Sequence, residues 1–437
     1  MKTKATMWGR KLAIASFTLT TALTSSAMAQ QTEIRIMAVD AYANAWQTTL
    51  VPEFEKAHPD IKVTIDATFG PEMLAKQMLD AIAPVPVYDI IFPDDPWVPQ
   101  LAEIGALVDL KGPEIAAMTD PDYDWADFNA TPLAAGEWQG KQYAIPVRSN
   151  MLMMFYNRAL YEKAGLPAPT PELTWDEFFE QAPKLVQDTN GDGQVDAWAI
   201  DTLFNRDGLT PTVWQTIMNS YGGNLLDDAG KPTFNNEVGV KALEMQKRLL
   251  DYAPPGALAH GFAESLQAFR QGQVAVLFTW GSVYRATATD ANVSNLTNGE
   301  VGMQILPVGT VSGGAHRGIW SAGIASKSPN KEAAWTFLQW LTSKEGERTN
   351  SQLVGSFPAR NSTLEEGARD PWQEAVFPAL RLAYDTAAGG KMWRIRSPKS
   401  DATQAIQADE VSRFFSGAAS AEDALNSAAA QIAEVLE

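Results

Sequence analysis

Cysteine is absent from this chain of 437 residues, and histidine occurs only three times. The absence of cysteine excludes disulfide frameworks, thiolate zinc sites, cysteine nucleophiles and thioether-linked lipid anchors. The histidines, His58, His260 and His316, lie far apart, and no His-Glu-x-x-His motif places two imidazoles on one helical face. The sequence therefore argues against a zinc hydrolase.

Positive charge is also scarce, because 34 Lys and Arg residues stand against 52 Asp and Glu residues and give a net charge of −18. Binding to phosphate backbones needs a basic face, so we expect no nucleic-acid partner and no docking on an anionic membrane. With 45% hydrophobic residues, the composition is that of a globular protein. At roughly 150 residues per domain, the length predicts two or three domains.

Residues 1–29 have the pattern of a secretory signal peptide. Four basic residues precede an apolar stretch over residues 12–23, and an Ala-x-Ala motif ends at Ala29, so we expect cleavage before Gln30. The apolar stretch is interrupted by Ser and Thr and is shorter than the roughly 20 residues that a membrane span needs. No later segment is apolar enough to span a bilayer. We therefore predict a soluble, exported protein, located in a Gram-negative periplasm.

Strand-like and helix-like segments alternate at the start of the remaining chain. Strands are predicted over 33–39, 61–67 and 88–92, and helices over 46–57 and 72–82. This order predicts a largely parallel sheet, in which ligands bind beyond the carboxyl ends of the strands. The residues that follow these strands are Asp40, Tyr42, Phe69, Gly70, Asp94, Asp95 and Trp97.

A second α/β region is predicted after Gly140. Its extended segments are 143–147, 152–156, 274–278, 301–306 and 319–325, and its helical segments are 175–187, 211–221, 236–251, 264–271 and 330–341. The last hundred residues are predicted to be helical over 371–388, 403–415 and 421–436.

Aromatic residues suggest what the protein binds. Several of the 14 tryptophans, Trp97, Trp280, Trp320 and Trp393, stand beside Gly, Pro or charged residues rather than in apolar runs. Indole rings stack on the C–H faces of sugars, while Asp, Asn and Arg side chains bond hydroxyl groups. Any single tryptophan fits a core position equally well. The group together favours a binding site for neutral carbohydrate.

A metal site is one interpretation of a short acidic loop. Asp188, Asn190, Asp192, Gln194 and Asp196 match the oxygen-ligand spacing of the first nine positions of an EF-hand loop, with Gly193 at the sharp turn. Ala199 stands where the bidentate Glu would be. An Asp/Gly-rich turn between a helix and a strand is the favoured interpretation, and a structural Ca²⁺ ion is the alternative. No other cofactor is expected.

Enzyme motifs are lacking. No dinucleotide-binding Gly-x-Gly-x-x-Gly pattern, phosphate-binding P-loop or nucleophile elbow is present. A pair of carboxylates for glycoside cleavage stays open, because sequence does not fix the separation of acidic side chains. We therefore expect that the protein is not an enzyme. The alternative is an exported enzyme that degrades carbohydrate.

Several stretches, in the same order along the chain, resemble the solute-binding proteins of bacterial sugar ABC importers, the extracellular family that includes maltose-binding protein. They are 54–63 (FEKAHPDIKV), 88–91 (YDII), 143–157, 319–341 (IWSAGIASKSPNKEAAWTFLQWL), 356–360 (SFPAR) and 420–425 (SAEDAL). The resemblance implies the two-lobe periplasmic binding protein fold of class α/β, each lobe a mainly parallel sheet flanked by helices. Residues 31–147 plus 320–360 would form lobe one, and residues 149–318 plus 361–437 lobe two.

The resemblance also implies the site and the partners. The sugar contacts of the family map onto Asp40, Tyr42, Asp94, Asp95, Trp97, Arg148, Asn150, Trp214, Trp280, Ser282, Trp320 and Trp393. Ala41 stands where maltose-binding protein has a basic residue, which argues against maltose itself. The ligand would close a hinge between the lobes, and the permease subunits of an ABC transporter in the inner membrane would recognise the closed monomer. An anionic sugar derivative, a phosphate or a sulfonate, is the alternative ligand if Arg148, Arg317 or Arg394 faces the cleft.

Overall fold

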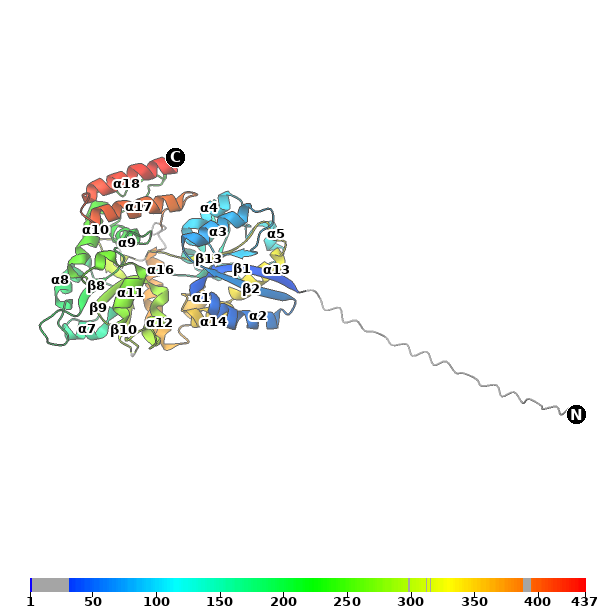
Figure 1. The fold of residues 1–437 in the computed structure, drawn as a ribbon, viewed down its shortest axis with the longest axis horizontal. Helices are drawn as coiled ribbons and strands as arrows, with labels where there is room; N and C mark the ends of the chain where they lie inside the picture. The colour runs from blue at the N-terminus through cyan, green and yellow to red at the C-terminus, as the bar shows by residue number, and fades with distance from the viewer. Residues whose placement is uncertain (2–30, 298, 312, 315, 388–393) are drawn as a thin grey trace.

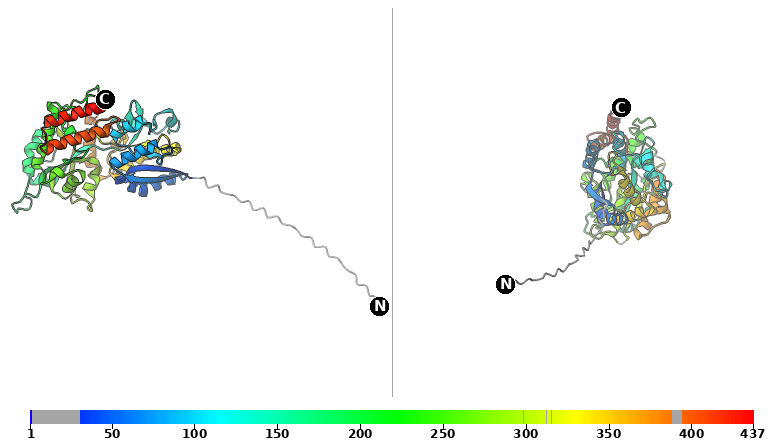
Figure 2. Two further views of the ribbon diagram at one scale, coloured as in Figure 1. Left: turned by 45° about the horizontal axis from the view of Figure 1, so that its top comes forward. Right: turned by 90° about the vertical axis from the view of Figure 1, so that its right-hand side faces the viewer.

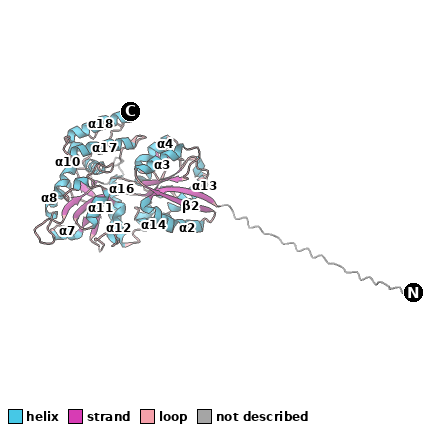
Figure 3. Ribbon diagram, in the orientation of Figure 1, coloured by secondary structure: helices cyan, strands magenta, loops and turns pink. Residues whose placement is uncertain are grey.

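The computed structural model describes the chain outside residues 2–30, 298, 312, 315 and 388–393. The predicted signal peptide and Trp393 therefore lie outside the described residues. Two α/β lobes stand side by side (Figure 1), and they remain distinct when the molecule is turned about the horizontal axis (Figure 2, left). Helices surround the strands of each lobe (Figure 3). The predicted two-lobe α/β fold is confirmed. The described helices include none long and apolar enough to cross a membrane.

Lobe one is built on a five-stranded sheet with the strand order β2-β1-β3-β13-β6. Its strands are β1 (Thr32–Val39), β2 (Ile61–Thr68), β3 (Ile90–Ile91), β6 (Ile145–Arg148) and β13 (Trp320–Ile324). β1 pairs in parallel with β2 and β3, with Ile36 opposite both Ile65 and Ile90. β13 is antiparallel to β3 and β6. The carboxyl ends of β1 and β3 therefore lie next to each other, as the strand and helix order predicts.

The helices of lobe one pack on both faces of this sheet. They are α1 (Asp40–Ala45), α2 (Val51–Ala57), α3 (Pro71–Ile82), α4 (Val98–Glu103), α5 (Pro113–Ala116), α6 (Ala130–Leu133), α13 (Lys331–Leu341) and α14 (Lys344–Val354). A π-helical turn, Trp46–Leu50, joins α1 to α2. The buried Trp46 in that turn donates its indole N–H to Asn350 Oδ1 of α14 at 2.7 Å, which ties the start of the lobe to its end.

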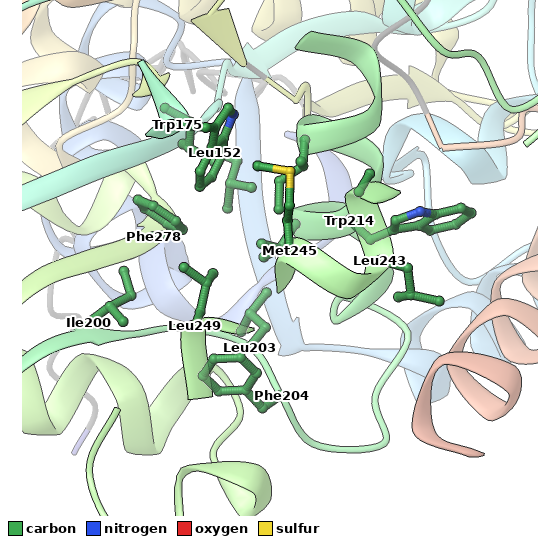
Figure 4. Close-up of a cluster of buried hydrophobic side chains, with 14 of the residues drawn as sticks. Leu152, Trp175, Ile200, Leu203, Phe204, Trp214, Leu243, Met245, Leu249 and Phe278 are labelled. Atoms are coloured by element: carbon green, nitrogen blue, oxygen red, sulfur yellow. The ribbon is translucent and has the colours of Figure 1, made fainter. Parts of the chain in front are cut away.

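Lobe two is built on a four-stranded sheet with the order β10-β7-β9-β8. Its strands are β7 (Leu152–Asn157), β8 (Trp198–Asp201), β9 (Val274–Trp280) and β10 (Val301–Gln304). β7 and β9 are buried along their whole length, which agrees with their apolar sequences. One face packs against a core that includes Trp175, Trp214 and Phe278 (Figure 4), and the other against a core around Phe155 and Phe377.

The helices of lobe two come from two separate parts of the chain. They are α7 (Arg158–Lys163), α8 (Trp175–Leu185), α9 (Pro211–Ser220), α10 (Glu237–Arg248), α11 (Phe262–Arg270), α12 (Tyr284–Thr289), α15 (Asn361–Glu365), α16 (Pro371–Ala387), α17 (Ser400–Phe415) and α18 (Ala421–Leu436). Two short hairpins, β4 (Glu137–Trp138) with β5 (Lys141–Gln142) in lobe one and β11 (Leu306–Val308) with β12 (Gly313–Gly314) in lobe two, complete the strands.

The sheets are more mixed than the expectation of mainly parallel sheets. Only the β2-β1-β3 side of lobe one and the β8-β9 pair of lobe two are parallel, whereas β7 is antiparallel to both of its neighbours. The alternation of strands and helices that predicts a parallel sheet covers residues 33–92 alone. β7 follows β6 directly, with no crossover helix between them, because the chain passes there from one lobe to the other.

Three segments carry the chain between the two sheets. The first joins β6 to β7, the second leads from Arg317 into β13, and the third runs from Ser356 to Arg360. The three lie together, because Gly318 donates its N–H to the Asn150 carbonyl at 3.0 Å and Ser149 forms a backbone bridge with Phe357. These segments are the place where the lobes can rotate relative to each other.

Candidate ligand-binding site between the lobes

The loops after β1 and β3 place polar and aromatic side chains at one edge of lobe one. Asp40 is exposed at the start of α1, and Tyr42 on the same helix is 1% exposed. Asp94 and Asp95 begin a 3-10 turn that ends at Trp97. Asp94 stabilises this turn by accepting the Asp95 backbone N–H at 3.0 Å. These residues lie at the same edge of the sheet because their strands, β1 and β3, are neighbours.

Arg148, Asn150 and Ser282 form a second cluster where the chain enters lobe two. The Ser282 hydroxyl accepts from an Arg148 Nη at 2.7 Å and from Asn150 Nδ2 at 3.0 Å, and the Ser282 N–H donates to Asn150 Oδ1 at 3.0 Å. The Arg148 guanidinium lies 5.4 Å from the ring centre of Tyr42. Burial lowers the pKa of Arg148. This cluster therefore connects Tyr42 of lobe one with Ser282 of lobe two.

Arg394 of lobe two joins the Asp94 and Asp95 pair of lobe one. Its two Nη atoms donate to the two carboxylate oxygens of Asp94 at 2.7 Å each, and one of them also contacts Asp95 Oδ1. Burial opposes the charge of Arg394, but the two carboxylates raise its pKa overall. Burial raises the pKa of Asp95 to about 7, and the attraction of Arg394 reduces this effect without cancelling it.

Several buried polar atoms at this interface have no hydrogen-bond partner among the described residues. They are Tyr42 Oη, Asp95 Oδ2, Arg148 Nε, Trp280 Nε1, Ser321 Oγ, Arg394 Nε and both ring nitrogens of His316. Buried polar groups in proteins almost always have a partner, because an unsatisfied one costs about 1–3 kcal/mol. Burial, with the charges of Arg394 and Arg317, holds the pKa of His316 well below its usual range, so its ring is neutral. A ligand with several hydroxyl groups would supply the missing partners.

Aromatic side chains accompany these polar atoms. Trp97 and Trp320 meet edge to face with ring centres 5.4 Å apart, and the exposed Phe69 lies 6.0 Å from Trp320. In lobe two, Trp280 lies 6.2 Å from the His316 ring and fills the space next to Gly318. Both lobes therefore have indole rings beside polar groups at this interface, an arrangement that can bind carbohydrate.

Trp214 does not join this group. It is fully buried on α9, donates its indole N–H to the Gly239 carbonyl at 2.9 Å, and lies beside Leu243 in the core of lobe two (Figure 4). The expectation of a sugar contact is corrected to a core role. Trp214 lies on a helix that is buried on all sides, so its position in the sequence did not distinguish a core residue from a ligand contact.

His316 and Ser321 were not among the predicted ligand-binding residues, and Arg394 was predicted only as an anchor for an anionic ligand. His316 and Ser321 flank the Gly318–Trp320 crossing segment. The boundary between lobe two and lobe one, which the resemblance places between residues 318 and 320, was the available signal. Arg394 is bound to two carboxylates, so it does not offer a free charge to an anion.

The acidic loop at 188–196 is organised by its own backbone. The Asp188 carboxylate accepts from Gly191 N at 2.6 Å and from Gly193 N at 2.7 Å, and these bonds lower its pKa. Asn190 and Asp192 accept from the backbone two residues ahead, and Asp196 accepts from Thr189. No group of three or more His, Asp or Glu residues in the described part of the chain is arranged to hold a metal ion. The backbone hydrogen bonds account for the shape of the loop as a turn, and a structural Ca²⁺ ion stays the alternative.

Comparison with known proteins identifies the family of this chain. A probable amino-acid ABC transporter periplasmic-binding protein of Sinorhizobium fredii is 26% identical over 344 residues, which cover 76% of this chain and 74% of that protein. The mannitol-binding protein of Pseudomonas aeruginosa is 28% identical over 256 residues, 56% of each chain. An ABC transporter solute-binding protein of Agrobacterium radiobacter, solved with ribitol, is 28% identical with a TM-score of 0.77 and covers 93% of this chain and 99% of its own. The family model for bacterial extracellular solute-binding proteins matches residues 40–348, and the chain belongs to this family.

Proposed function

We propose that this protein is the exported substrate-binding component of an ABC importer, and that it binds a neutral sugar or sugar alcohol between its lobes. The observation that carries the proposal is the group of buried, unpartnered polar atoms that lies beside Trp97, Trp280 and Trp320 at the interface of the lobes. The mannitol-binding relative and the ribitol-bound structure support the same class of ligand.

The chemistry of the unpartnered atoms fits hydroxyl groups. Asp95 Oδ2 can only accept a hydrogen bond while ionised, Trp280 Nε1 can only donate one, and the Tyr42 hydroxyl can do both. A hydroxyl group of the ligand also donates and accepts, so one polyol can satisfy all three kinds of partner. An anionic ligand fits less well, because the Asp94 and Asp95 carboxylates already take up the charge of Arg394 and would repel a second anion.

Binding would act through closure of the lobes rather than through chemistry. A ligand that contacts Tyr42 and Asp95 of lobe one and Trp280 of lobe two stabilises the closed arrangement by its contacts with both sides. The permease subunits in the inner membrane would then receive the closed form. The members of this family are solute-binding proteins, which supports a role without catalysis.

Export supports the same role. The basic and apolar pattern of residues 1–29 favours secretion with cleavage before Gln30, and the relatives include periplasmic-binding proteins. Expression of the full chain in a Gram-negative host, followed by N-terminal sequencing of the periplasmic fraction, should return Gln30 as the first residue. Recovery of the uncleaved chain with the membrane fraction would contradict export as a free protein.

A thermal-shift screen followed by calorimetry tests the ligand class. The mature protein would be screened against D-mannitol, ribitol, D-glucose, maltose, sn-glycerol 3-phosphate and the common L-amino acids. We expect a neutral polyol or sugar to raise the melting temperature by several degrees, because a ligand at 100 times its Kd stabilises the folded state by about 2.7 kcal/mol. A shift with the phosphate or with an amino acid alone would overturn the neutral-carbohydrate assignment, and cleavage of an oligosaccharide would indicate an enzyme.

A further inference from the structure

A short segment of lobe two, residues 394–400, lies directly against lobe one. Ile395 anchors the segment in the core of lobe two, and the side chains around it reach across the interface. Arg394 binds Asp94 and Asp95. Arg396 donates to the carbonyl oxygens of Ala134, Ala135 and Glu137 at 2.9, 3.0 and 2.6 Å. The Ser400 hydroxyl, at the start of α17, donates to the Pro96 carbonyl at 2.6 Å. We call these contacts the interlobe clasp.

The central ion pair of the clasp is buried and has strong geometry. Arg394 is 4% exposed and Asp95 is fully buried, and the contact between Arg394 and Asp94 is bidentate. Separating such a pair without access to water leaves uncompensated buried charges, which is strongly unfavourable. Because the partners belong to different lobes, the pair can form only when the lobes are together on this side.

The clasp also borders the proposed ligand. Asp95 Oδ2 and Arg394 Nε belong to the paired side chains and are among the buried atoms without a partner. The clasp thus contributes both a hydrogen-bond acceptor and a donor to the site. A ligand that extended beyond these atoms, between residues 394–400 and the 94–96 segment, would have to break the ion pair and the contacts of Arg396 and Ser400.

We propose that Arg394 is a specificity-determining residue: the interlobe clasp closes one side of the site and restricts the ligand to the size of a single sugar or sugar alcohol. This proposal rests on the proposed function for the identity of the ligand class. The closing role of the clasp does not depend on it, because the contacts form between protein groups alone.

The first experiment measures the clasp without any ligand. The chain has no cysteine, so Ala75→Cys on α3 and Ala405→Cys on α17, both exposed positions, allow two spin labels, one on each lobe. We expect a population with a short label distance in the otherwise unchanged protein, and the loss of this population in favour of longer distances after Arg394→Gln. Arg206→Gln is the matched control, because Arg206 forms an exposed ion pair with Asp409 within lobe two. An unchanged distribution after Arg394→Gln would overturn the clasp.

Two further variants guard against a folding defect. Arg394→Gln leaves two buried carboxylates without their partner, so combining it with Asp94→Asn and Asp95→Asn removes the charge from both sides. Arg396→Gln removes the hydrogen bonds to the carbonyl oxygens of Ala134, Ala135 and Glu137 and leaves Arg394, Asp94 and Asp95 in place. We expect both variants to lengthen the distance between the two spin labels. If the distance stays unchanged in both variants, the clasp is contradicted.

The second experiment measures size selection by calorimetry with D-mannitol, ribitol, D-glucose, maltose and maltotriose. We expect the unchanged protein to bind a one-unit ligand at least tenfold more tightly than the two oligosaccharides, and the Arg394→Gln protein to lose most of this preference. Tight binding of maltotriose by the unchanged protein would overturn the size restriction. Binding of none of the five compounds would contradict the proposed function and the size restriction together, while the label distances would still decide whether the clasp exists.

Discussion

At the scale of the residue, Tyr42 and Tyr161 offer a direct comparison. Both side chains are buried, and both hydroxyl groups lack a partner among the described residues. Tyr42 lies at the interface of the lobes beside Arg148, whereas Tyr161 lies in the core of lobe two. Tyr42→Phe should weaken ligand binding about tenfold, the effect of losing one hydrogen bond of about 1.4 kcal/mol, as measured by calorimetry.

The matched control is Tyr161→Phe, which removes the same atom from a site with no proposed ligand. We expect this variant to keep the affinity of the unchanged protein. Both variants should keep or slightly raise the melting temperature of the ligand-free protein, because neither loses a protein hydrogen bond. Equal loss of affinity in the two variants would show that the Tyr42 hydroxyl does not contact the ligand.

The buried ring of His316 should make the stability of the folded protein depend on pH. Burial first, and then the charges of Arg394 and Arg317, hold its pKa well below 6.5 in the folded state. The unfolded chain therefore takes up a proton below pH 6.5 that the folded chain does not, and stability is lost as the pH falls through that value. Between pH 6.5 and 5.5 this group should cost about 1 kcal/mol of unfolding free energy. Urea unfolding at the two pH values gives the change in unfolding free energy for each protein. This change should be smaller in the His316→Gln protein than in the unchanged protein by the same amount.

Asp95 also makes stability depend on pH, but with the opposite sign to His316, and it does so in both the unchanged and the His316→Gln proteins. Because burial raises its pKa to about 7, the folded state holds its proton more tightly and loses stability as the pH rises toward neutrality. Comparison of the two proteins removes most of this contribution. His58→Gln is the matched control, since His58 lies partly exposed and stacked on Phe54. A pH profile unchanged by His316→Gln would mean that the buried ring takes up a proton in the folded state.

At the scale of the element, the crossing segments depend on close backbone packing. A Cβ atom at Gly318 would meet ring atoms of Trp280 at 2.4 and 2.7 Å. Gly318→Ala should therefore push Trp280 out of position, destabilise the protein by about 1–3 kcal/mol and weaken ligand binding. Gly208→Ala is the control, because its nearest neighbour would be Gln404 Oε1 at 3.7 Å. Denaturant unfolding and calorimetry measure both effects, and equal behaviour of the two variants would contradict the packing argument.

Sequence periodicity predicted elements best where burial is regular. β1, β2 and α3 match their predicted ranges within one residue at each end, because apolar residues alternate or recur at helical spacing there. Helix α14 was not predicted, since its stretch of polar residues carries no apolar stripe and is held by contacts such as Trp46 to Asn350. The site residues at strand ends followed from topology. The sequence could not predict the contact of Arg394 with Asp94, because the two residues are 300 positions apart in the chain.

At the scale of the whole molecule, the two lobes have separate cores and are joined by buried polar contacts. The core of lobe one contains Trp46 and Trp335, and the core of lobe two contains Trp175 and Trp214, with no shared apolar residue between these clusters. The lobes are instead connected by the three crossing segments and by the Arg394 ion pair. Coupling of this kind depends on charge pairing and backbone hydrogen bonds, so it can be released for opening without disrupting either core.

The same coupling predicts that the lobes unfold together. Unfolding of lobe two alone would remove Arg394 from Asp94 and Asp95 and break the crossing segments, which makes a half-folded state costly. In this cysteine-free chain, Ala334→Cys in α13 and Ala242→Cys in α10 place one fully buried thiol in each lobe. Pulsed thiol labelling across a urea series should give coincident midpoints for the two thiols. When Arg394→Gln is added, the two midpoints should move apart. Separate midpoints without this substitution would show that each lobe unfolds independently.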